Sequence, residues 1–222
     1  MKKSEIAKTV INNNGGIART TDFLAAGLSK PDIGELCNKG VLARIRQGFY
    51  QLAEDVTITE AQYLSALLPD GIVCVESALF YYGYSDFAPR VWTIAVPRSI
   101  SLTRLKFDVV PVKAYFVPKD IFEIGKSQGT FDGATLCIYD RERTICDCFK
   151  YRTKLDNETF NKAVNAYVTD DKKNLSNLSR YAKELGLYKR VMDLMEVMLN
   201  GRYCSLCIGE TKKIDFNLMK RH

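Results

Sequence analysis

Histidine is almost absent from this chain of 222 residues, and the only one, His222, is the last residue. This excludes histidine-based catalytic triads and leaves no set of histidines to bind a metal ion. Long apolar runs are missing as well, because none approaches the ~18 residues that a membrane-spanning helix needs. The polar, amphipathic start does not resemble a signal peptide. We therefore expect a soluble cytoplasmic protein that makes no contact with a membrane.

Patterns of catalytic and phosphate-binding sites are also scarce. The glycines between residues 125 and 133 do not follow the spacing of a phosphate-binding loop. Metal-dependent cleavage of nucleic acid requires clustered carboxylates with a nearby lysine. The nearest candidates are Asp132, Asp140 and Glu142, but no lysine lies two residues after Glu142, and we expect Asp140 to cap the following helix. We therefore expect no enzyme activity, no metal ion and no cofactor.

The seven cysteines are an odd number and lie mostly in apolar segments, which is typical of reduced, buried thiols. Cys204 and Cys207 supply only half of a zinc site. Cys146 and Cys148 do not complete it, because two residues at that spacing cannot share one helix face. We interpret Cys204 and Cys207 as two incidental thiols in a C-terminal strand.

The first fifty residues, by contrast, carry a strong pattern of short helices separated by glycine. A helix from about Ser4 has apolar residues on one face and must stop at residues 14–16. A second helix opens at Thr20 or Thr21, either of which can cap it, and closes at Gly27.

The third helix has the best predicted caps of the chain. Ser29 and Asp32 approximate a capping box at its start, and Gly40 suits its end. Its inward stripe is apolar and its outward positions are polar or charged. These outward residues are Lys30, Asp32, Glu35, Asn38 and Lys39. In a helix-turn-helix domain, the corresponding helix enters the major groove of DNA.

Residues 41–50 predict two strands around a tight turn at Gln47-Gly48. Period-two alternation places Arg44 and Arg46 on one face of this hairpin, where they suit contact with phosphates or with the minor groove. Three helices followed by such a hairpin are the parts of a winged helix-turn-helix in order. The pattern favours double-stranded DNA as the partner over a module that binds only protein.

Charge supports this interpretation. Residues 1–50 hold eight Lys and Arg against four Asp and Glu, a net charge of +4 out of +6 for the whole chain. A second basic run, residues 90–119, holds six Lys and Arg, with Asp108 as its only acidic residue. This run is either a second strip that faces nucleic acid or a set of solubilising charges at turns and strand edges.

The sequence after residue 55 predicts a mixed-sheet domain that ends in a helical bundle. Thr57 and Glu60 form a capping-box signal for a helix that ends near Leu68. On a helix, Arg143 and Asp147 are i, i+4 neighbours and predict an ion pair. Strands are predicted at 91–96, 107–111, 113–117 and 134–139, and further helices at 75–82, 119–124, 141–152, 157–168, 174–185 and 187–199. The predicted fold class is α+β, with a winged helix-turn-helix domain over 1–55 and a mixed-sheet α/β domain over 56–222.

Several of these segments resemble the AbiEi-type antitoxins, the regulators of type IV (abortive-infection) toxin–antitoxin pairs. The N-terminal resemblance rests on the run from Gly15 to Ser29, on Lys39-Gly40-Val41-Leu42 and on Gly48-Phe49-Tyr50. In the second domain it rests on Glu76-Ser77-Ala78-Leu79, on residues 91–97 and on residues 142–147. The resemblance covers roughly residues 4 to 200.

The resemblance implies a repressor that binds inverted repeats in its own promoter. It also implies an antitoxin that counters a co-encoded nucleotidyltransferase-like toxin without a stable complex, and it leaves room for a dimer on DNA. The residues that we expect at the DNA are Arg19, Thr20, Thr21, Ser29, Lys30, Asp32, Glu35, Asn38, Lys39, Arg44, Arg46 and Gln47. The alternatives are a protein-binding module that keeps the winged fold as a scaffold and, less favoured, a protein with a nuclease-like second domain.

Overall fold

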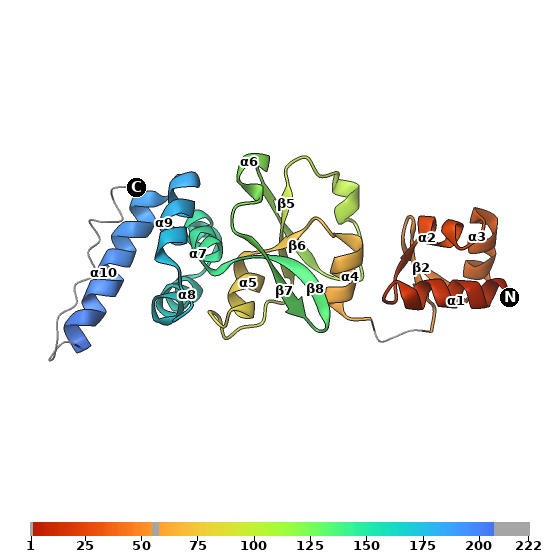
Figure 1. Ribbon diagram of the computed structural model, residues 1–222, viewed down its shortest axis with the longest axis horizontal. Helices are drawn as coiled ribbons and strands as arrows, with labels where there is room; N and C mark the ends of the chain where they lie inside the picture. The colour runs from red at the N-terminus through yellow and green to blue at the C-terminus, as the bar shows by residue number, and fades with distance from the viewer. Residues whose placement is uncertain (1, 55–57, 207–222) are drawn as a thin grey trace. The chain divides into compact units, whose positions relative to one another are not determined.

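The computed structural model describes residues 2–54 and 58–206, with side chains up to residue 199 (Figure 1). It is a mixed α+β structure, which confirms the predicted fold class at that level. The described chain forms two compact units. The first takes in the chain up to Gly71 together with Ser99–Val112 and Gly129–Leu136, and the second holds the other described residues. The domain boundary predicted at residues 55–56 falls among residues outside the described ones and stays a prediction.

The N-terminal part of the first unit is built from helices and a small sheet around one apolar core. Phe23 and Tyr50 meet edge to face at its centre, with ring centroids 5.8 Å apart. The helices are α1 (Lys3–Asn13), α2 (Thr20–Ala25) and α3 (Lys30–Asn38). The strands are β1 (Ala18–Arg19), β2 (Leu42–Arg46) and β3 (Phe49–Leu52), in the antiparallel order β1-β3-β2.

The helix caps match the sequence prediction at α3 and differ from it at α2. The Ser29 side chain accepts a hydrogen bond from the Asp32 backbone N–H, and the Asp32 carboxylate accepts one from the Ser29 N–H at 2.8 Å, so the capping box is confirmed. At α2 the cap prediction for Thr20 or Thr21 is wrong. The chain stays extended through Arg19, and the Asp22 carboxylate accepts the Arg19 backbone N–H at 2.7 Å.

A β-bulge changes the predicted geometry of the hairpin. Arg44 is paired with Tyr50 and Arg46 with Phe49, so Ile45 is an extra residue without a partner of its own. Because Phe49 and Tyr50 are consecutive in a strand, they point to opposite faces. Arg44 and Arg46 therefore also lie on opposite faces, and the alternation that placed them together is wrong.

The rest of the first unit contains α4 (Glu60–Leu67) and a short 3-10 helix, η1 (Leu102–Leu105). Thr59 and Gln62, rather than the predicted pair, form the capping box of α4, and Thr57 lies outside the described residues. The strand predicted at 107–111 is wrong. Its buried side chains, Phe107 and Val110, are three residues apart, which is not the spacing of one strand face.

The main sheet has five strands in the order β6-β5-β4-β8-β7. They are β4 (Ile72–Val73), β5 (Trp92–Pro97), β6 (Val112–Val117), β7 (Lys126–Phe131) and β8 (Ala134–Tyr139). Strand β4 is antiparallel to β5 and parallel to β8, which confirms a mixed sheet. Strand β7 was not predicted, because its residues are mainly polar. The signal for it was Asp132-Gly133, a typical hairpin turn whose residues both have positive φ.

The predicted helices of the second unit are confirmed, and α7 to α10 pack against one another (Figure 1). Their bounds are α5 (Val75–Tyr81), α6 (Lys119–Phe122), α7 (Arg141–Lys150), α8 (Asn157–Thr169), α9 (Leu175–Glu184) and α10 (Tyr188–Leu206), with a 3-10 turn, η2 (Arg152–Lys154). Helix α10 includes Cys204, so the strand predicted there is wrong, because a single Gly201 does not interrupt a helix. Cys207 lies outside the described residues.

The start of α7 anchors the second unit. The Asp140 carboxylate accepts the Arg143 backbone N–H, which confirms the predicted cap. The Arg143 guanidinium is fully buried, 3.1 Å from the Asp147 carboxylate, and it donates to the carbonyl oxygens of Ile121 and Ile124. The predicted ion pair is therefore present, and it ties α7 to the chain around α6.

Candidate nucleic-acid interface

The outward face of α3 carries acidic residues, and each of them has a basic partner. Lys3 Nζ lies 2.6 Å from an Asp32 carboxylate oxygen, and Lys39 Nζ lies 2.6 Å from a Glu35 carboxylate oxygen. Hydrogen bonds from Lys3 and Ser29 hold the pKa of Asp32 well below its usual range, and the hydrogen bond from Lys39 lowers the pKa of Glu35. A neighbouring ammonium group thus offsets the negative charge of each carboxylate and reduces the repulsion that it would exert on phosphate.

The remaining polar side chains of this face are accessible. Lys30 and Asn38 are exposed, and Lys30 has no ion-pair partner within the described part of the chain. Ile33 and Leu36, on the other side of α3, are buried in the N-terminal core. The face therefore presents positive and amide groups to solvent and is held in place by its apolar side.

The start of α2 is joined to the turn of the β2–β3 hairpin. The Thr20 backbone N–H donates to the Gly48 carbonyl oxygen at 2.9 Å, and Gly48 has φ +83°, a conformation that favours glycine. Arg19 and Thr21 are exposed beside this bond, and Gln47 is exposed at the turn itself. The structure thus brings the predicted residues of α2 and of the hairpin turn close together.

The two hairpin arginines have different surroundings. Arg44 is exposed and lies over the Tyr50 ring, 5.5 Å from its centroid. Arg46 is half-buried and donates hydrogen bonds to the carbonyl oxygens of Leu67 at 2.8 Å and Arg104 at 2.7 Å. Burial lowers the pKa of Arg46, and the nearby guanidinium groups of Arg104 and Arg19 lower it further. Arg44, which also donates a long hydrogen bond to the Tyr50 hydroxyl at 3.4 Å, is accessible to a ligand in solvent, whereas Arg46 is held within the first unit.

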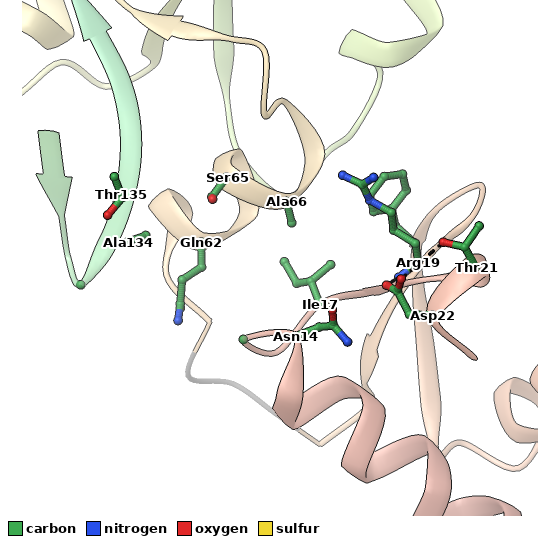
Figure 2. A pocket seen from close by; sticks show the side chains of 13 residues that line it. Asn14, Ile17, Arg19, Thr21, Asp22, Gln62, Ser65, Ala66, Ala134 and Thr135 are labelled. Carbon is green, nitrogen blue, oxygen red and sulfur yellow. Dashed lines mark hydrogen bonds between the residues drawn. The ribbon is translucent and has the colours of Figure 1, made fainter. Parts of the chain in front are cut away.

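Described residues of the first unit line at least two hollows. The cavity in Figure 2 has a volume of about 550 Å³ and is lined mainly by polar groups, including Arg19, Asp22, Gln62 and Thr135. The second is a groove of about 610 Å³ beside the hairpin. Its basic residues are Arg19, Arg46, Arg104 and Lys106, and its one carboxylate among the described lining residues is that of Asp70. The basic run noted in the sequence pointed to Arg104 and Lys106 but did not place them beside the hairpin.

The carboxylates considered for metal-dependent cleavage have structural partners. Asp140 caps α7 and also accepts the Tyr181 hydroxyl at 2.9 Å. Glu142 is buried and accepts the backbone N–H of Asn174 at 2.7 Å, and Asp132 lies in the β7–β8 turn. Among residues 2–54 and 58–199, no group of three or more His, Cys, Asp and Glu side chains is arranged to hold a metal ion.

Residues 5–53 match the family model described as "Transcriptional regulator, AbiEi antitoxin". The resemblance to the AbiEi antitoxins is confirmed for this segment. It covers α1 to β3, the part of the chain that carries α3 and the hairpin. No curated protein gave a significant match to this chain.

One solved structure supports the fold of nearly the whole chain. The crystal structure of the RV2827C protein from Mycobacterium tuberculosis is similar to it with a TM-score of 0.58. The match covers 93% of this chain and 82% of that chain at 14% sequence identity. At this identity the similarity concerns the fold alone. Within the described part of the chain, every helix is too short or too polar to cross a membrane.

Proposed function

We propose that this chain is a DNA-binding transcriptional repressor of the AbiEi antitoxin type and not an enzyme. The observation that carries the proposal is the family match over residues 5–53, the same residues that form three helices and a hairpin around one core. In this proposal they constitute a winged helix-turn-helix domain. Its third helix, α3, enters the major groove, and the β2–β3 hairpin is the wing.

The charges of the described residues support a binding mode with α3 in the major groove and the hairpin beside it. Lys30 lies in the first turn of α3, the part of such a helix that approaches the bases, and the ion pairs of Asp32 and Glu35 offset the acidic charge beside it. Thr21 and Arg19, at the start of α2, are placed for phosphate contact. Arg44, on the exposed edge of the wing, is placed for the flanking backbone.

The finer part of the proposal follows from the family. In it, the protein represses its own operon at inverted repeats, with room for a dimer on the DNA. It also counters a co-encoded nucleotidyltransferase-like toxin without a stable complex, and the predicted second domain, residues 56–222, contributes to this antitoxin activity.

The first test is binding of the full chain to the duplex upstream of its own gene and to a scrambled duplex, across a salt series. We expect a preference of roughly a thousandfold or more for the promoter duplex. Lys30→Gln and Arg44→Gln should weaken binding, and a lost phosphate contact should reduce the salt slope by about one. Lys189→Gln, which removes an exposed lysine from α10, is the matched control and should change neither value.

Equal and salt-sensitive binding to both duplexes would refute sequence-specific repression. If a protein partner were still bound by the Lys30→Gln and Arg44→Gln variants, the winged fold would be a scaffold for protein binding. The antitoxin half is tested separately, by co-expression with the neighbouring gene. Rescue of growth without co-purification of the two proteins is the expected result, and failure to rescue would refute it.

A further inference from the structure

The groove beside the β2–β3 hairpin concentrates positive charge. Arg19 and Arg46 both lie over the Phe49 ring, 5.6 Å and 4.3 Å from its centroid. The Arg104 backbone carbonyl accepts a hydrogen bond from Arg46, which brings this third arginine to the same groove. The positive charges of Arg104 and Arg19 oppose that of Arg46, and after burial they are the further causes of its lowered pKa.

The protein itself supplies little negative charge to offset this repulsion. Asp70 is the one carboxylate among the described lining residues, and it lies 2.9 Å from an Arg104 guanidinium nitrogen. The Asp70 side chain is 63% exposed, so this pair is a weak surface ion pair. Arg19 has no ion-pair partner within the described residues.

The groove also provides hydrogen-bond donors in a fixed arrangement. Two of the five N–H groups of Arg46 are bonded to carbonyl oxygens, which fixes the plane of the guanidinium and leaves its other donors available. Thr103 and Gln47 add neutral polar groups to the lining. Planar guanidinium groups match the oxygen atoms of a phosphate group in geometry and in charge.

We propose that this groove binds a phosphate group between Arg19, Arg46 and Arg104, with Lys106 at its margin. The phosphate comes either from the backbone of bound DNA or from a free phosphate compound. A site for the DNA backbone extends the DNA-binding function proposed above and rests on it, whereas a site for a free phosphate compound does not. In both cases Asp70 occupies the site as a weak internal substitute for the ligand, and the ligand displaces it from Arg104.

The test measures binding of the full chain to two probes, tripolyphosphate and duplex DNA. Arg104→Gln and Arg19→Gln are expected to weaken binding of the relevant probe by about tenfold. Asp70→Asn, which removes the competing carboxylate, is expected to tighten binding severalfold. Arg90→Gln is the matched control, because Arg90 is an exposed arginine of the same basic run and does not line the groove. Circular dichroism confirms that each variant is folded.

The direction of the Asp70→Asn effect separates a ligand site from a structural ion pair. If Arg104 and Asp70 served only to hold each other, both substitutions would change binding in the same direction or not at all. Opposite effects on DNA, on the promoter and the scrambled duplex alike, would identify the DNA backbone as the source. Opposite effects on tripolyphosphate alone would identify a free phosphate compound.

Unchanged binding of both probes in Arg104→Gln and Arg19→Gln would overturn the proposal. The result is separable from the function proposed above. A chain that does not distinguish its promoter from a scrambled duplex fails as a specific repressor, yet the groove is still assessed by tripolyphosphate and by the non-specific DNA affinity.

Discussion

Asp147→Asn is the substitution whose cost the structure defines most directly. The Asp147 carboxylate lies 3.1 Å from Nε of Arg143, and the two side chains are 1% and 0% exposed. Asparagine keeps the volume but removes the negative charge, so the guanidinium stays buried without a counter-ion. Loss of one partner from a buried ion pair costs about 3–5 kcal/mol. That is a large fraction of the roughly 5–15 kcal/mol that stabilises a typical domain.

Urea unfolding followed by circular dichroism measures this loss as a fall in the free energy of unfolding. Thermal unfolding should show a fall in Tm on the order of 10 °C. Glu184→Gln, on the exposed face of α9, is the matched control and should stay within about 0.5 kcal/mol of the unaltered protein. A cost for Asp147→Asn below about 1 kcal/mol would refute the reasoning. It would mean that the carbonyl oxygens of Ile121 and Ile124 are sufficient to hold the Arg143 charge.

Three further predictions follow from the same contacts. Lys3→Gln leaves Asp32 without its ammonium partner on α3 and should weaken DNA binding in an anisotropy titration, with restoration by adding Asp32→Asn. Gly125 has φ +72°, and in Gly125→Ala the added Cβ would lie 2.4 Å from Arg143 Cβ. The substitution should lower the free energy of unfolding in urea by about 3 kcal/mol, and an unchanged value would contradict the packing. Burial raises the pKa of Glu142. The stability that its protonated form contributes is therefore complete below the pKa of the unfolded state, about 4.3, and is lost as the pH rises through the pKa of the folded state. The unaltered protein should therefore lose stability relative to Glu142→Gln as the pH rises above about 4, and parallel pH profiles would contradict this.

Local signals in the sequence predicted much of the architecture. The capping box at Ser29, the turn at Gln47-Gly48 and the cap at Asp140 each involve neighbouring residues whose chemistry permits few conformations. The helices from α7 to α10 followed from apolar periodicity in the same way. At these sites the interacting groups are close in sequence, and pattern and structure agree.

The predicted caps of α2 and α4 lie one or two residues from the observed ones. Other misses depend on partners that are distant in sequence or on a change of register. The bulge at Ile45 is visible only from the pairing of β2 with β3. The polar strand β7 lacks the apolar alternation that identifies half-buried strands, although its turn residues were present. The groove brings together residues as far apart as Arg46 and Arg104, and no local pattern encodes such a contact.

The extra residue in β2 has a consequence for how this hairpin changes during evolution. Because Ile45 has no cross-strand partner, loss of its codon would make Arg44 and Arg46 consecutive residues of a regular strand, and consecutive residues point to opposite faces. A three-base deletion would thus remove the bulge and still leave Arg44 at the wing edge and Arg46 at the groove, without changing the charge of the protein. The hairpin can therefore gain or lose one residue at this position and keep both arginine-bearing surfaces, so two relatives that differ in length there would present the same surfaces.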